Sequence, residues 1–337
     1  MEFVVVGAGG VGCYIGGRLA AGGAKVVFVG RPSVLDPIAA AGLTVTDLDG
    51  FRAELRPGDV ACVGSCAEAV AKIETGHDAT ILLTVKGPAT EQAAAEIAAA
   101  FPAGTLVVSF QNGVDNVARV RSKAPQVDVV AGMVPYNLVW LGPAHVHRGT
   151  GGGALHLADT PRTRQLAPAF ETSGLGLTFD ADMPAVQWGK LLVNLNNPVN
   201  ALSGIPLREE LADRDYRRSW ALLMSEGLRV LEAAKIEPAR ILALPASGLV
   251  HVLPLPNPVF RTAARQMAAI DPSARSSMAD DLRLRRPTEI DDLCGAILRL
   301  GQTVGVPAPA NAKMCGLVSN FDGTYLSGPE LLAGLQA

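Results

Sequence analysis

Short apolar runs alternate with helical patterns in the first half of the chain. The runs predict β-strands at residues 3–6, 25–29, 79–85, 105–110 and 127–131. Helical patterns lie between them, and the clearest is the alanine-rich stretch 90–100. Strands that alternate with helices indicate a parallel sheet that is covered on both faces. We therefore predict an α/β domain with a mainly parallel sheet.

The pattern changes further along the chain. Residues 134–157 mix glycine, proline and histidine with short β-like pieces, which predicts antiparallel strands added to the same sheet. From about Trp188 onward the patterns are long and helical. They predict helices at residues 188–202, 212–234, 263–267, 275–285 and 287–300. We therefore predict two domains, an α/β domain at residues 1–181 and an all-α domain at residues 182–337.

Length and charge agree with a two-domain enzyme. The chain has 337 residues, and domains usually have about 100 to 200. The 29 Lys and Arg nearly balance the 32 Asp and Glu, and no long run of one sign occurs. This balance argues against nucleic acid and anionic membranes as partners. Because no apolar run reaches about eighteen residues, we expect no membrane span and a cytoplasmic location.

Candidate metal ligands are few. Five cysteines are scattered along the chain without the spacing of a disulfide framework or a CxxC metal site, so we expect buried free thiols. His145 and His147 share one face of a predicted strand, but no third ligand is apparent. A polar strand face is the favoured interpretation, and a hairpin turn is favoured for residues 149–153. We predict no metal centre.

A glycine-rich turn follows the first predicted strand. Its residues are Gly7, Ala8, Gly9, Gly10, Val11 and Gly12, which match the pattern G-x-G-x-x-G. The first glycine makes the turn, the second lets a diphosphate approach the backbone, and the third lets helix and strand pack closely. The alternative is a tight turn without a ligand. The strand before it and the helix after it favour a dinucleotide site of the Rossmann type, where N–H groups at the helix start bind phosphate.

The end of the second predicted strand indicates which dinucleotide binds. A site for NAD usually has Asp or Glu there, which accepts a hydrogen bond from the ribose 2′-hydroxyl. This chain has Gly30 and Arg31 instead. A guanidinium pairs with a 2′-phosphate, whereas a carboxylate repels it. We therefore predict NADPH as the cofactor; in the alternative interpretation Arg31 is a surface charge.

Further motifs occur in order along the chain. Lys86 and Gln111-Asn112-Gly113 each follow a predicted strand, Trp188-Gly189-Lys190 begins a helix that contains Asn194 and Asn197-Pro198, and Ser276-Ser277-Met278 precedes Thr288-Glu289-Ile290-Asp291. Together these motifs resemble the ketopantoate reductase (2-dehydropantoate 2-reductase) family over nearly the whole chain. The resemblance implies NADPH-dependent reduction of a 2-keto acid to the (R)-2-hydroxy acid in pantothenate synthesis. It also implies a cleft between a Rossmann domain and a helical domain.

Lys190 is the candidate general acid. On one continuous helix, Asn194 and Asn197 lie about 40° and 20° from Lys190, so one narrow face carries an ammonium and two amides. Reduction of a ketone places negative charge on its oxygen, and a lysine with a lowered pKa suits proton donation there. The resemblance assigns this role to Lys190. Without the resemblance, a surface lysine at a helix start is the alternative.

The resemblance assigns further residues to the substrate and the cofactor. It implies that Glu289 binds a substrate hydroxyl near the lysine, and that Asn194, Asn197 and Ser277 contact the substrate. It implies that Asn112 meets the nicotinamide ribose and the substrate carboxylate, and that Lys86 contacts the cofactor. The structural alternatives are a helix-start glutamate, an Asn-Gly turn and a solvent-facing lysine. Asp281, one turn after Ser277, is expected to orient a neighbour or to cap locally.

The chain departs from the family pattern in two places. The second asparagine usually stands where this chain has Pro198, so Asn197 or Asn200 takes that part. The segment 241–271 is proline-rich and longer than in compact members, which leaves the substrate more open than the reaction. The alternatives are a D-2-hydroxyacid dehydrogenase that acts on another 2-keto acid, such as the D-mandelate type, and an NADP-binding sensor without turnover. The oligomeric state is left open, with a homodimer among the expected arrangements.

Overall fold

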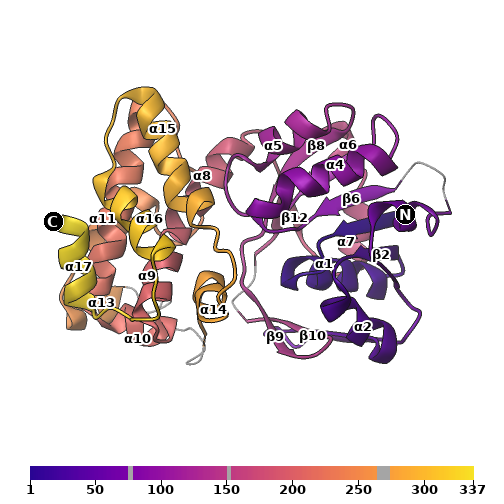
Figure 1. Ribbon diagram of the computed structural model, residues 1–337, viewed down its shortest axis with the longest axis horizontal. Coiled ribbons are helices and arrows are strands. Elements are labelled where there is room, and N and C mark those ends of the chain that lie inside the picture. Colours follow the sequence, from indigo (N-terminus) through magenta and orange to yellow (C-terminus); the bar gives the residue numbers. More distant parts are fainter. Residues whose placement is uncertain (75–78, 150–152, 264–273) are drawn as a thin grey trace. The chain divides into compact units, whose positions relative to one another are not determined.

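The computed structural model describes residues 1–74, 79–149, 153–263 and 274–337 (Figure 1). The chain divides into two compact units, Met1–Met183 and Pro184–Ala337. The first unit contains the strands, and the second is helical in its described part. No helix among the described residues is long and apolar enough to span a membrane. The predicted fold class, an α/β domain followed by a helical domain, is confirmed.

The main sheet of the N-terminal unit has eight strands in the order β12-β11-β8-β7-β6-β1-β2-β5. They are β1 (Glu2–Val6), β2 (Lys25–Val29), β5 (Ala61–Val63), β6 (Thr80–Leu83), β7 (Leu106–Ser109), β8 (Asp128–Met133), β11 (Leu155–Ala158) and β12 (Leu177–Asp180). Neighbours pair in parallel, except that β11 runs antiparallel to β8. The strands predicted from the apolar runs all lie here, side by side from β8 to β2.

Hydrophobic cores cover both faces of the main sheet. Phe3 and Val5 of β1 belong to one cluster, and Val4 and Val6 belong to the other. Because successive side chains of a strand point to opposite faces, the uninterrupted apolar run of β1 is the signature of burial on both sides. The helices of this unit are α1 (Gly10–Ala21), α2 (Pro32–Ala41), α3 (Cys66–Val70), η1 (Gly87–Ala89), α4 (Thr90–Ala100), α5 (Asn116–Lys123), α6 (Pro161–Arg164) and α7 (Ala167–Thr172).

A second sheet has the order β4-β3-β10-β9. Its strands are β3 (Leu43–Asp47), β4 (Arg52–Leu55), β9 (Leu138–Gly142) and β10 (His145–Arg148). The prediction that residues 134–157 extend the main sheet is therefore wrong for β9 and β10, and holds only for β11. The reason is the alternating segment 43–47, whose strand β3 offers β10 a parallel partner. His145 and His147 share one strand face as predicted, and both contact Thr46 Oγ1, at 2.9 and 2.8 Å.

A buried charge cluster ties this second sheet to α1. Arg18 of α1 donates from Nη1 to Asp47 Oδ2 at 2.9 Å. Arg148 at the end of β10 pairs with the same carboxylate at 3.2 Å. All three side chains are almost fully buried, and a buried charge that loses its partner is strongly destabilising. The cluster therefore fixes the second sheet, β9 included, against α1.

The C-terminal unit is built from helices. They are α8 (Met183–Asn194), α9 (Asn196–Ser203), α10 (Leu207–Ala212), α11 (Arg214–Ala233), α12 (Ala246–Val252), α13 (Asn257–Ala263), α14 (Ser277–Arg283), the π-helix η2 (Asp291–Gly295), α15 (Ala296–Val304), α16 (Pro309–Ser319) and α17 (Gly328–Gln336). Buried Arg217 donates to the carbonyls of Leu253 and Leu255, both at 2.8 Å, and so fixes part of the proline-rich segment 241–271. Residues 264–271 of that segment, and most of the predicted helix 263–267, lie outside the described residues.

Two predicted helices differ from those observed. The helix predicted at 188–202 is interrupted at Leu195, between α8 and α9. A proline ring clashes with the carbonyl four residues earlier, and for Pro198 that residue is Asn194, the last residue of α8. The helix predicted at 287–300 begins only at Ile290 and runs first as a π-helix. Pro287 therefore lies outside its first turn, contrary to the prediction.

Candidate functional site

The carboxyl ends of four neighbouring strands carry the predicted cofactor residues. The strands β7, β6, β1 and β2 are adjacent in the main sheet. Asn112 follows β7, Lys86 follows β6, the glycine turn follows β1 and Arg31 follows β2. Ligands of open α/β sheets bind at this edge. The fold therefore brings these residues, far apart in the sequence, to one edge of one sheet.

The glycines of the turn have three different surroundings. Gly7 has φ +107°, and a Cβ there would lie 2.6 Å from Val85 N. A Cβ on Gly12 would lie 2.4 Å from Gly7 O, so helix and strand pack too closely for any side chain. A Cβ on Gly9 would meet no atom within 4 Å. The open space over Gly9 and the crowding at Gly7 and Gly12 are what a dinucleotide turn requires.

The first turn of α1 has backbone donors to offer. Gly9 is its N-cap and supplies no side-chain hydrogen bond, and the turn contains no acidic residue. The first N–H groups of a helix have no partner within the helix, and its N-terminus carries partial positive charge. Gly7 N and Ala8 N donate to Val29 O at 2.9 and 3.3 Å, which fixes the turn at the end of β2. An anion with several acceptor oxygens fits the exposed donors.

Arg31 lies beside this turn. Gly30, the residue before Arg31, lies close to the glycine turn, because a Cβ on Gly30 would lie 2.8 Å from Ala8 Cβ. The next residue, Arg31, is exposed and is the N-cap of α2. Arg31 is therefore an exposed basic residue directly after the part of the chain that adjoins the glycine turn.

Gln111 is a residue whose role the sequence did not reveal. It is buried, and its Nε2 donates to Val85 O at 3.0 Å and to Thr90 Oγ1 at 2.7 Å. It thereby joins the end of β7 to the end of β6, next to Lys86. Asn116 Nδ2 donates to Asn112 O at 2.6 Å, which fixes the backbone of Asn112. A polar residue directly after an apolar strand was the only signal available.

Lys190 lies in α8 and is partly buried. Within the described part of the chain it makes no hydrogen bond or ion pair. Burial lowers the pKa of its ammonium to about 8. Asn194, one helical turn later, is buried. A lysine that is partly desolvated and lacks a carboxylate partner is poised to release a proton near neutral pH.

Asn197 and Asn200 have different surroundings. Asn200 is fully buried, its Oδ1 accepts from Ser276 N at 2.8 Å, and its Nδ2 donates to Ile205 O at 3.0 Å. Asn197 is only partly buried, and its carbonyl accepts from Ser276 Oγ at 3.1 Å. The structure thus brings Asn197 next to the start of α14, where Ser277 is exposed. The side chain of Asn200 supports this junction.

Glu210 completes the support beneath this junction. Its Oε2 accepts from Asn196 Nδ2 at 3.1 Å and from Asn200 Nδ2 at 3.3 Å. Burial raises the pKa of the Glu210 carboxyl to about 8. Two buried acceptors here, Glu210 Oε1 and Asn196 Oδ1, have no hydrogen-bond partner among the residues that the structure describes. Protonation of Oε1 turns one of these acceptors into a donor, so the neutral acid suits the site.

We expect the stability of the protein to fall as pH rises, in a way that depends on Glu210. Because its folded pKa of about 8 exceeds the ordinary value of 4.5, the contribution is complete below about pH 4.5 and is lost as pH rises through 8. Glu210→Gln should remove this pH dependence, which amounts to on the order of a few kcal/mol in the free energy of unfolding. Urea unfolding between pH 6 and 9 measures it. Glu209→Gln, at the exposed neighbour, is the control. Equal pH dependence in the wild type and Glu210→Gln would contradict the prediction.

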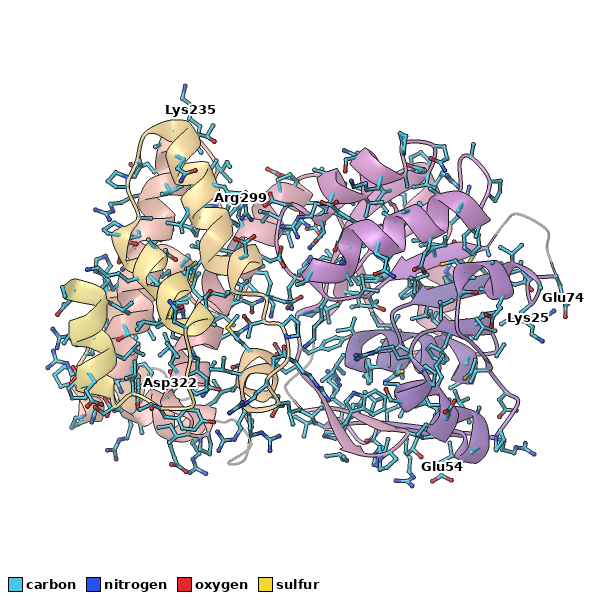
Figure 2. The ribbon with its side chains drawn as sticks, viewed as in Figure 1. Lys25, Glu54, Glu74, Lys235, Arg299 and Asp322 are labelled. Carbon is cyan, nitrogen blue, oxygen red and sulfur yellow. The ribbon has the colours of Figure 1, made fainter. Side chains whose placement is uncertain are left out.

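Glu289 lies two residues before the π-helix η2. Its carbonyl accepts from Asp292 N at 3.1 Å and from Leu293 N at 3.2 Å. Arg299, labelled in Figure 2, donates from Nη1 to Asp291 Oδ2 at 2.9 Å and so fixes the start of η2 from α15. π-Helical turns occur frequently at functional sites. The partly buried Glu289 is thus hydrogen-bonded to the start of the helix whose first turns form the π-helix η2.

Metal ligands do not gather in the described residues. No group of three His, Cys, Asp or Glu with metal-binding geometry occurs there. The five cysteines are free thiols, but the prediction that they are buried holds only for Cys13, Cys66 and Cys294, since Cys62 and Cys315 are partly exposed. Asp281 is buried in α14, one turn after Ser277. The predicted turn at 149–153 lies largely outside the described residues.

An open glycine turn at the carboxyl edge of a parallel sheet, followed by a helical unit with a partly buried lysine, is the arrangement expected of a two-domain dinucleotide-binding oxidoreductase. The model of the family "Ketopantoate reductase PanE/ApbA" matches residues 3–162, and that of its C-terminal part matches residues 182–322. The chain therefore belongs to the ketopantoate reductase PanE/ApbA family. The resemblance recognised in the sequence is confirmed.

Individual relatives cover nearly the whole chain or all of it. A 2-dehydropantoate 2-reductase of Halobacterium salinarum is 31% identical over 324 residues, which cover 94% of this chain and 98% of the relative. A PanE/ApbA family ketopantoate reductase from Ralstonia eutropha JMP134 superimposes with a TM-score of 0.78 and 26% identity, over 100% of both chains. A ternary structure of D-mandelate dehydrogenase with NADH and anilino(oxo)acetate superimposes with a TM-score of 0.75 and 21% identity, again over 100% of both. The last shows a shared fold.

Proposed function

We propose that the protein reduces 2-dehydropantoate to (R)-pantoate with NADPH, and that Lys190 is the general acid. The observation that carries the proposal is the surroundings of Lys190: burial lowers its pKa to about 8, and no carboxylate among the described residues neutralises it. A relative 31% identical over nearly the whole chain is a 2-dehydropantoate 2-reductase, which supports the choice of substrate.

Each of the proposed site residues has its own role in the reaction. Lys190 donates a proton from Nζ to the keto oxygen as negative charge develops on it. Asn194, Asn197 and Ser277 bind and orient the substrate, Asn112 contacts its carboxylate, and Glu289 accepts a hydrogen bond from the substrate hydroxyl. Lys190 then regains a proton from water, which a pKa of about 8 allows near neutral pH.

The N-terminal unit fits a dinucleotide on its own geometry. The space over Gly9 is open, and the first turn of α1 is uncapped. The residues that would hold it are the turn 7–12, Arg31, Lys86 and Asn112. When bound, the dinucleotide supplies the hydride. Arg31 would pair with the 2′-phosphate of NADPH, which NADH lacks.

Replacing Arg31 tests the preference for NADPH. Arg31→Ala should weaken NADPH binding by about tenfold or more, because a hydrogen bond to a charged group contributes about 1.5 to 3 kcal/mol. NADH binding should change little. Both dissociation constants are measured by calorimetric titration, with Arg56→Ala on the exposed surface as control. Equal weakening of both cofactors would place Arg31 away from the 2′-phosphate.

A second function is favoured by one observation. D-mandelate dehydrogenase shares the fold over the full length of both chains, and its structure contains NADH. The second candidate is thus a D-2-hydroxyacid dehydrogenase that reduces another 2-keto acid. Initial rates with NADPH and NADH across a panel of 2-keto acids separate the candidates. Fastest turnover of ketopantoate supports the proposal, and absence of turnover with every acid would leave an NADP-binding sensor.

A further inference from the structure

Strand β9 lies beside the first turn of α1. A Cβ on Gly10 would lie 3.4 Å from Leu138 Cβ and 3.9 Å from Trp140 Nε1. The indole nitrogen of Trp140 is therefore a near neighbour of the glycine turn, although the two are more than a hundred residues apart in the sequence. The parallel pairing of β10 with β3, which the sequence did not indicate, creates this proximity.

Trp140 is unlike the other tryptophans of the chain. It is 40% exposed, whereas Trp188 and Trp220 are 7% and 3% exposed. Among the described residues its indole N–H has no hydrogen-bond partner. A large aromatic side chain with one free donor is suited to contact a ligand that is apolar on one side and polar on the other.

The start of α1 provides hydrogen-bond donors next to Trp140. The backbone N–H groups at the start of α1 are uncapped, and no acidic side chain lies in that turn. The indole can also only donate. Such a set binds a ligand with negative charge and several acceptor oxygens, and the diphosphate of a dinucleotide is such a group. An apolar ligand would leave these donors unpaired.

We propose that Trp140 is a cofactor-binding residue, whose indole N–H donates to a phosphate oxygen of the dinucleotide at the turn Gly7–Gly12 and whose ring covers the diphosphate. The proposal rests on the proposed function to the extent that this turn binds a dinucleotide. It explains why an exposed tryptophan lies on an edge strand next to Gly10. It also gives the second sheet a role at the site.

Calorimetric titration of the full-length protein with NADPH tests the proposal. Trp140→Phe keeps the ring and removes the N–H, and should raise the dissociation constant by about fivefold to tenfold. Trp140→Ala should raise it further. Leu141→Ala is the matched control, because Leu141 is the next residue of β9 and is also exposed, at 59%. Circular dichroism confirms that each variant is folded.

A fragment of the cofactor locates the contact. Adenosine 2′-monophosphate contains the 2′-phosphate but no diphosphate, so Trp140→Phe should leave its binding unchanged while it weakens NADPH. Unchanged binding of NADPH, or equal weakening of both ligands, would overturn the role of Trp140 and leave the proposed function intact. Failure of the wild type to bind either NADPH or NADH would overturn both proposals.

Discussion

Lys190→Met is expected to lower kcat for 2-keto acid reduction by at least about a hundredfold, the usual effect of losing a general acid. Methionine keeps the length of the side chain and fills the partly buried site without a charge. NADPH binding should be unchanged, because Lys190 lies in the helical unit and the predicted cofactor residues lie in the sheet unit. Steady-state kinetics and calorimetric titration measure the two quantities.

The control for this substitution is Lys235→Met. Lys235 is an exposed lysine in the same unit (Figure 2). Its replacement should leave kcat near the wild-type value. Near-normal turnover in Lys190→Met would show that another group donates the proton, and the proposed mechanism would fail.

The protonation of Lys190 also determines how kcat depends on pH. The ammonium predominates below its pKa of about 8 and is lost above it. The kcat for reduction should therefore be level below about pH 7 and fall about tenfold per unit well above pH 8. Oxidation of the hydroxy acid should show the opposite trend, since neutral Lys190 is then the base. Lys190→Met should show neither trend.

Features of the fold that depend on local pattern could be predicted from the sequence. The strand β1 and its turn Gly7–Gly12 form a continuous segment, and residues 3–6 of the strand, which are buried on both faces of the sheet, are all apolar. The break at Leu195 also had a local signal, because the ring of Pro198 clashes with the carbonyl of Asn194 and so interrupts the helix. The predicted angle around the helix axis between Lys190 and Asn197 assumed one continuous helix over residues 188–202. Because the helix is interrupted at Leu195, that angle does not hold.

Features that depend on distant partners could not be predicted. Asn197 and Asn200 are equivalent in the sequence, and only the hydrogen bond from Ser276 N, 76 residues away, shows that Asn200 is a supporting residue. Trp140 is similar, because its position beside Gly10 depends on β10 pairing with β3. Such pairing is chosen by packing across the whole unit, and no short window of sequence contains it.

Substrate preference is expected to depend strongly on Glu289. If the substrate is ketopantoate, its hydroxyl needs an acceptor, and Glu289 is the proposed one. A 2-keto acid without that hydroxyl does not form this hydrogen bond in the transition state, and so loses the stabilisation that it provides. The wild type should therefore prefer ketopantoate over 2-ketoisovalerate by at least about a hundredfold in kcat/KM.

Glu289→Gln should shrink this preference by about tenfold, because the amide still accepts a hydrogen bond but lacks the negative charge that strengthens it. Glu232→Gln, at an exposed position of α11, should leave the preference unchanged. Separate kcat and KM values for both acids provide the measurement.

If the wild type reduces 2-ketoisovalerate or an aromatic keto acid as well as ketopantoate, then Glu289 does not bind a substrate hydroxyl. The segment 241–271, part of which Arg217 holds through the carbonyls of Leu253 and Leu255, would then be the place to seek the determinant of specificity.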